Sequence, residues 1–198
     1  MRATWAIYKR ELQSAFYTPL AYVILVVFLL WNGGVFSILM QSFAANPELS
    51  SARGPMQLLF GGSILFFLPL LLFCPAITMR LLAEERRTGT LETLLTAPVR
   101  DVEVVLAKYL AALTVFLSLW APTLLYALVI RRYGPVDWGA LGAAYFGTTL
   151  VGAAFLSIGL FASALSRSQV VAFILGFAGT GGLMFLLGLG KYAFTEER

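Results

Sequence analysis

Five long runs of apolar residues, none of which contains an aspartate, glutamate, lysine or arginine, dominate this sequence. The runs cover about residues 20–40, 58–79, 109–130, 141–165 and 170–189. Because an α-helix rises about 1.5 Å per residue, a run of about 20 residues crosses the roughly 30 Å hydrocarbon core of a bilayer. We therefore predict an all-α fold, a polytopic integral membrane helix bundle that forms a single domain over residues 1–198.

The composition excludes several classes of protein. Only 12% of the 198 residues are charged, against about 25% in a typical soluble domain. The chain has no histidine and a single cysteine, Cys74, so it offers no disulfide framework, no Cys/His metal site and no Ser-His or Cys-His catalytic pair. It also lacks the G-x-x-x-x-G-K-[ST] loop that binds nucleotide phosphates. We expect no catalytic residue, no metal and no directly bound cofactor.

Lysine and arginine lie at the ends of the apolar runs, and their distribution predicts the orientation in the membrane. If the N-terminus is cytoplasmic, nine of these residues fall on the inner side and five on the outer side, as the positive-inside rule favours. The inner set includes Lys108, and the outer set includes Arg131 and Arg132. The net charge of +4 thus reflects topology, and we expect no nucleic-acid partner.

The first residues predict an amphipathic interface helix over about residues 2–17. Its apolar side chains recur every three or four residues, whereas its basic and polar residues fall elsewhere on the helix. Pro19 restricts the residue before it and ends this helix before the first span. The simpler interpretation is an ordinary basic flank, but the pattern favours a helix lying on the membrane surface. The residues that form its apolar side are Trp5, Tyr8, Leu12 and Phe16.

The segment between the second and third runs, residues 80–101, is the longest charged stretch of the chain. We expect the second span to extend through Arg87 and then to break at a Thr-Gly-Thr sequence, where Gly89 caps a short new helix. Pro98 ends that helix, and Asp101 is the expected N-cap of the third span. Charged segments usually are solvated loops, which is the simpler interpretation.

The short helix would carry a leucine face formed by Leu91, Leu94 and Leu95. Exposed leucines in a cluster need a cover. The candidates are the N-terminal amphipathic helix and a docked partner protein.

These two segments carry a resemblance to a known family. The sequences "MRLLAEERRTGTLETLLTAPVRDVEVVLAKYLAAL" and "YKRELQSAFYTPLAYVIL" resemble the cytoplasmic signature and the start of type 2 ABC transporter permeases, most closely the gliding-motility (GldF-like) type. The resemblance implies a permease subunit of an ATP-driven exporter in the bacterial inner membrane. A separate ATPase subunit would bind ATP and Mg²⁺, and a second permease chain would complete a homo- or heterodimer.

The resemblance also implies roles for particular residues. Arg10 and Glu11 would lie on the interface helix. Within a coupling segment over residues 80–101, a coupling helix that docks on the ATPase would comprise Thr88, Gly89, Thr90, Leu91, Glu92, Leu94 and Leu95. Glu84, Glu85, Arg86 and Arg87 would lie on the approach to it.

Members of this family usually have six spans, and the sequence supplies five. We expect the sixth span to be missing or truncated. The segment between the first two spans is too short for a folded external domain, so external specificity would come from an accessory periplasmic or membrane subunit or from the membrane pathway itself.

The absence of charged residues from the predicted spans indicates where the energy for active transport would come from. Ion-driven carriers usually place an ionisable group at membrane depth, and these spans have none. Active transport would therefore take its energy from another polypeptide. The alternatives are a passive channel or membrane scaffold without ATPase coupling and, more remotely, an intramembrane enzyme, for which no general base is present.

Prolines and glycines mark two of the spans. Pro69 and Pro75 in the second span are candidates for a gating kink, although proline is also well tolerated in membrane helices. The small residues of the fifth span are expected to let neighbouring helices approach closely. They are Gly176, Gly179, Gly181 and Gly182.

Overall fold

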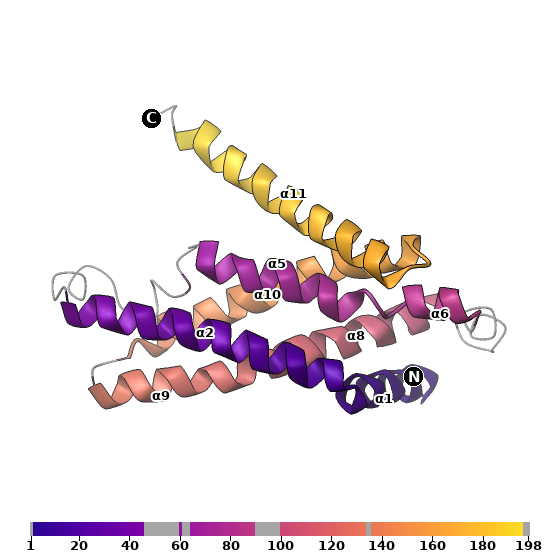
Figure 1. The fold of residues 1–198 in the computed structure, drawn as a ribbon, viewed down its shortest axis with the longest axis horizontal. Coiled ribbons are helices and arrows are strands. Elements are labelled where there is room, and N and C mark those ends of the chain that lie inside the picture. Colours follow the sequence, from indigo (N-terminus) through magenta and orange to yellow (C-terminus); the bar gives the residue numbers. More distant parts are fainter. Residues whose placement is uncertain (1, 46–59, 61–63, 90–99, 134–135, 196–198) are drawn as a thin grey trace.

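The computed structural model describes residues 2–45, 60, 64–89, 100–133 and 136–195, and no β-strand is found among them. Five stretches of helix in this part of the chain are long and apolar enough to cross a membrane. Most of the helices run along the long axis of the molecule (Figure 1). The predicted all-α, polytopic membrane bundle is confirmed.

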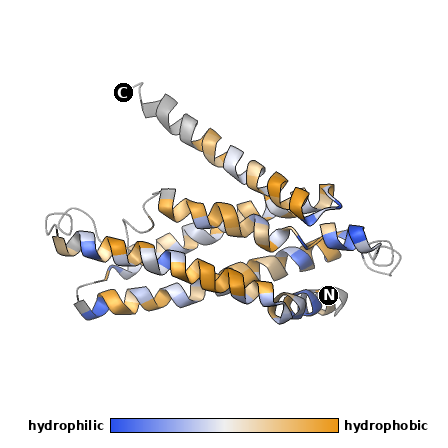
Figure 2. Cartoon of the chain, viewed as in Figure 1, coloured by the Kyte–Doolittle hydropathy of each residue, from blue (hydrophilic) through white to orange (hydrophobic). Residues whose placement is uncertain are grey.

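The described elements are all helical. In chain order they are α1 (Arg2–Tyr17), α2 (Pro19–Ala45), α5 (Ile64–Thr78), α6 (Ala83–Thr88), α8 (Asp101–Trp120), the 3₁₀ turn η1 (Ala121–Thr123), α9 (Leu124–Tyr133), α10 (Trp138–Leu165) and α11 (Gln169–Thr195). The helix α1 has the range expected for the amphipathic helix: it ends at Tyr17, and Thr18 separates it from Pro19, which begins α2. Residues with low hydropathy gather at the ends of the bundle, in α1, α6 and the end of α9 (Figure 2).

The third spanning helix begins one residue before the position that the sequence predicts. Its first residue is Asp101, and the N-cap is Arg100, so the expectation that Asp101 is the N-cap is wrong. The Arg100 backbone N–H donates to the Glu103 carboxylate at 3.4 Å, which satisfies a donor at the helix start. Pro122 lies in η1, where its missing N–H suits the tight turn between α8 and α9.

The second spanning helix is interrupted sooner than expected. The sequence predicts a continuous extension to Arg87, but α5 ends at Thr78, and residues 79–82 form a turn before α6 begins. Both Pro69 and Pro75 are buried inside α5. Whether they serve a gate stays a prediction.

Aromatic side chains and small residues form the core between α2, α5, α8 and α10. The rings of Phe28 and Trp120 meet edge to face with centroids 5.1 Å apart, a favourable aromatic geometry. Two glycines of α10 allow close packing of the helices. The Thr78 side chain occupies the space that a Cβ at Gly159 would need, and the Phe116 ring occupies the space that a Cβ at Gly152 would need. These two glycines of α10 were not predicted.

The glycines predicted in α11 have unequal surroundings. Gly176 lies against Pro75 and Gly179 against Ile158, so close approach is confirmed at these two positions. Gly182 has no neighbour within 4 Å of the position of an added Cβ, and Gly181 has only an ordinary contact. The C-terminal half of α11 leads away from the bundle (Figure 1).

Candidate functional site

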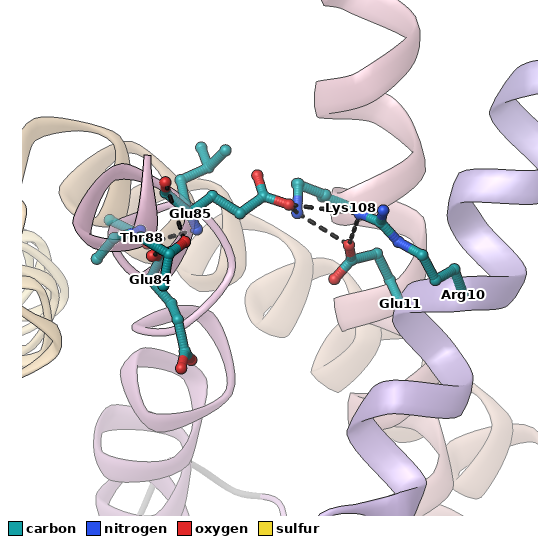
Figure 3. Close-up of polar contacts among 9 residues, drawn as sticks. Arg10, Glu11, Glu84, Glu85, Thr88 and Lys108 are labelled. Carbon is teal, nitrogen blue, oxygen red and sulfur yellow. Dashed lines mark hydrogen bonds and ion pairs between the residues drawn. The ribbon is translucent and has the colours of Figure 1, made fainter. Parts of the chain in front are cut away.

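Charged side chains from α1, α6 and α8 meet at one end of the bundle (Figure 3). The Lys108 ammonium in α8 donates to Glu11 Oε1 of α1 at 3.0 Å and to Glu85 Oε1 of α6 at 2.8 Å. The Arg10 guanidinium reaches the same two oxygens, at 3.1 Å on Glu11 and 3.5 Å on Glu85. We call these four residues the charged junction, and through it one cation joins three helices.

Burial makes the pairing at Lys108 necessary. Its side chain is 1% exposed, and the side chains of Glu11 and Glu85 are 15% and 16% exposed. An ammonium group removed from water is stable only when it is paired and hydrogen-bonded. With two cations and two carboxylates the charged junction is formally neutral, so the charges can lie at the end of an otherwise apolar helix.

The amphipathic helix α1 packs along α8, and this packing brings Glu11 to the charged junction. The Tyr8 hydroxyl and the Thr114 hydroxyl share a hydrogen bond of 2.9 Å, and the Trp5 ring stacks on that of Tyr8. Leu12 is half-buried. Trp5 and Phe16 are 65% and 37% exposed, so they are available to the membrane. The interface-helix residues therefore divide between contacts with the bundle and exposed aromatic rings.

A serine from α10 fixes the turn between α5 and α6. The Ser163 hydroxyl accepts hydrogen bonds from the backbone N–H groups of Leu82 at 3.1 Å and Ala83 at 3.0 Å, and it donates to the Met79 carbonyl at 3.2 Å. The N-cap of α6, Leu82, has no capping side chain of its own. Ser163 therefore supplies from another helix the cap that the local sequence lacks.

The helix α6 carries the charged part of the predicted coupling segment. Glu84 pairs with Arg80 at 3.1 Å and with Arg87 at 3.8 Å, and the Thr88 hydroxyl donates to the Glu84 carbonyl at 3.0 Å. Arg86 and Arg87 are exposed. Glu84, Arg86, Arg87 and Thr88 lie on the short helix beside the charged junction, and Arg80 lies in the turn that precedes it.

Gly89 closes α6 and does not start a new helix with N-cap geometry. Its φ of 73° and ψ of 1° are those of the left-handed region, which favours glycine at the end of a helix. The remaining coupling residues, Thr90, Leu91, Glu92, Leu94 and Leu95, lie outside the described residues. Their expected role stays a prediction.

Sequence reasoning missed two residues of this region. Lys108 directly precedes the third apolar run and was counted only as a charge that sets topology, and nothing in the local sequence indicates its burial. Ser163 lies within an apolar run, and no local pattern distinguishes it from Ser157 on the same helix. Its role depends on a turn about 80 residues earlier in the chain.

The family comparison covers nearly the whole chain. A family described as "ABC-2 family transporter protein" matches residues 5–194. The matched range runs from α1 into α11 and includes the charged junction and Ser163. No curated protein and no solved structure was found to match the chain.

Proposed function

The chain belongs to the ABC-2 family of transporter proteins, and from this membership we propose that it is the permease subunit of an ATP-driven ABC exporter. In this proposal two permease chains form the translocation path between them. A separate ATPase subunit binds ATP and Mg²⁺ and docks on the segment that follows α6. The closer likeness to gliding-motility permeases stays a prediction.

The observation that carries the proposal is the position of Lys108. The predicted coupling helix begins at Thr88, the last residue of α6, and α6 contacts α8 and α1 through Glu85, Lys108 and Glu11. At its other end α6 is capped by Ser163 of α10. A displacement of α6 therefore acts on three helices at once, and two of them, α8 and α10, belong to candidate spans.

The mechanism that fits this arrangement is alternating access. Closure of two ATPase subunits on ATP displaces the segment after Gly89, and α6 passes that displacement to α8 and α10. The spans then tilt around the path between the two permease chains. Rigid contacts with two discrete arrangements are the physical basis of such coupling between distant sites.

The proposed location is the bacterial inner membrane, with the N-terminus in the cytoplasm. The lysine and arginine distribution supports this orientation. It places α1, α6 and the charged junction on the side where ATP is available. An accessory subunit on the opposite side would supply external specificity.

Reconstitution with candidate ATPase subunits tests the proposal. The full-length chain is purified with each ATPase, placed in liposomes, and ATP turnover is measured with and without the permease. Leu91→Asp together with Leu94→Asp, or Glu92→Lys, is expected to dissociate or uncouple the ATPase, because the proposed docking surface is apolar with one carboxylate. Lys9→Asp on the exposed side of α1 is the matched control and is expected to leave coupling intact.

Two outcomes would contradict this proposal. Normal assembly and coupled ATP turnover in both docking variants would show that this segment does not dock on the ATPase. Solute flux that requires no ATPase in any preparation would favour a passive channel.

A further inference from the structure

A cavity of about 490 Å³ lies beside the charged junction. It is enclosed by the bend between α1 and α2, the bend between α5 and α6, and one side of α8. Its polar lining consists mainly of six ionisable residues: Arg10, Glu11, Arg80, Glu84, Glu85 and Lys108. The volume is within the range of about 300–1,000 Å³ that is usual for small-molecule sites.

The lining changes from charged to apolar along α8. Lys108 lies at one end, Ala111 and Val115 follow on the same side of the helix, and Leu119 lies at the other end. These eleven steps correspond to about 16 Å at the helical rise. Ile24 and Ile77 add apolar surface from α2 and α5. The cavity thus matches a molecule with a charged head and a hydrocarbon tail, aligned with a candidate span.

The charges of the cavity balance. Three cationic side chains and three carboxylates line it, so a ligand of a single sign meets as much repulsion as attraction. A ligand that carries both signs can face each set separately. The polar end therefore favours a zwitterion over a simple anion or cation.

Two groups at the polar end have hydrogen-bonding capacity to spare. Glu85 Oε2 is buried and has no hydrogen-bond partner among the described residues, whereas Oε1 accepts from both Lys108 and Arg10. Glu85 lines the cavity, and the last torsion of a glutamate is soft, so its carboxylate can reorient toward a ligand. The Arg10 side chain is 60% exposed, which leaves guanidinium N–H groups available to an anion.

We propose that this cavity binds a phospholipid whose headgroup carries a phosphate and a primary ammonium, as in phosphatidylethanolamine. The phosphate lies against the guanidinium groups of Arg10 and Arg80, and the ammonium donates to Glu85. The acyl chains follow Ile77 and Val115 toward the apolar end. The site lies within one chain and is separate from the translocation path proposed between two chains.

The chemistry of the ammonium distinguishes this ligand from other lipids. A primary ammonium has three N–H donors, whereas the quaternary ammonium of phosphatidylcholine has none and cannot satisfy Glu85 Oε2. Phosphatidylglycerol lacks the positive charge. The soluble headgroup glycerophosphoethanolamine has the charges without the acyl chains, so it separates a lipid site from a site for a free phosphate ester.

Native mass spectrometry of the full-length chain, delipidated in detergent, tests the proposal. Phosphatidylethanolamine, phosphatidylcholine and phosphatidylglycerol with identical acyl chains are titrated separately, together with glycerophosphoethanolamine. We expect phosphatidylethanolamine to bind about tenfold more tightly than phosphatidylcholine, the difference that one hydrogen bond to a charged group provides. The soluble headgroup is expected to bind more weakly than its lipid.

Variants locate the binding in the cavity. Arg10→Gln is expected to weaken phosphatidylethanolamine binding, and Glu85→Gln to reduce its preference over phosphatidylcholine. Ile24→Trp fills the apolar end and is expected to reduce binding of all three lipids. Arg86→Gln on the exposed side of α6, outside the cavity lining, is the matched control. Thermal melting in detergent checks that each variant is folded. If Glu85→Gln does not fold, Arg10→Gln still tests the site, because the Arg10 side chain is exposed and its replacement is expected to be tolerated.

Three results would overturn the proposal. These are equal affinity for phosphatidylethanolamine and phosphatidylcholine in the unmodified chain, unchanged lipid binding in a folded Arg10→Gln variant, and soluble headgroup binding as tight as that of the lipid.

Discussion

Lys108 is a buried cation on a helix that otherwise suits a membrane, and its two carboxylate partners come from other helices. Glu11 and Glu85 both place Oε1 within 3.0 Å of the Lys108 ammonium. Without this cation the two carboxylates would face each other with only the more exposed Arg10 between them. Removal of one partner from a buried pair leaves an uncompensated charge, and that loss exceeds the net contribution of the intact pair.

We predict that Lys108→Met destabilises the protein by about 3–5 kcal/mol, the usual effect of breaking a buried ion pair from one side. Chemical denaturation in detergent measures the change. The matched control is Lys9→Met, because Lys9 is exposed on α1, and its effect is expected to be within about 0.5 kcal/mol.

A compensated variant separates charge from packing. Lys108→Met combined with Glu11→Gln and Glu85→Gln removes the carboxylates as well, so most of the lost stability is expected to return. If Lys108→Met alone is no more harmful than Lys9→Met, the charged junction does not stabilise the fold.

At the scale of elements, α6 depends on α10 for its start and on glycine for its end. The helix has six residues, too few to be stable by themselves in water. Its first amides bond to the Ser163 hydroxyl, and Gly89 ends it in the left-handed conformation. Tertiary contacts therefore determine where this charged helix begins.

We predict that Ser163→Ala destabilises the fold by about 0.5–2 kcal/mol, the range for loss of a helix N-cap. Hydrogen–deuterium exchange is expected to show faster exchange of the Leu82 and Ala83 amides. Ser157→Ala on the same helix is the control, since that exposed hydroxyl donates only to the Ala153 carbonyl of its own helix. Equal exchange in the two variants would show that Ser163 does not cap α6.

At the scale of the whole molecule, the charged ends of the bundle differ. The charged junction and α6 lie at one end, and the basic end of α9 lies at the other (Figure 1). With the proposed orientation, the first end faces the cytoplasm. Arg131 lies over the Trp138 ring at 5.8 Å, an arrangement suited to the opposite membrane surface.

We predict that single cysteines at these two ends react from opposite sides of the membrane. In a Cys74→Ala background, Lys9→Cys and Arg86→Cys are expected to react with a membrane-impermeant maleimide only when the cytoplasmic side is accessible. Arg132→Cys is expected to react in intact cells. Modification of Lys9→Cys from outside would reverse the proposed orientation.

The amino-acid sequence predicts the helices much better than the contacts between them. The spans and α1 follow from local properties, namely the length of apolar runs and the spacing of apolar residues before Pro19. The start of α8 is predicted to within one residue, at Asp101, but the burial of Lys108 could not be predicted, because a charged residue counts against a membrane helix until its partners are known. For Lys108 those partners lie 97 and 23 residues away, in α1 and α6.

The two attachments of α6 restrict how it can move. Its N-terminal end is bonded to Ser163, and Glu85 in the middle of the helix is bonded to Lys108. A short rigid rod with two anchored points retains one free motion while both bonds persist, a swivel about the line that joins them. In the proposed mechanism, a push on the chain beyond Gly89 would therefore reach α8 and α10 as a rotation of α6, in a direction set by these two contacts and not by the direction of the push.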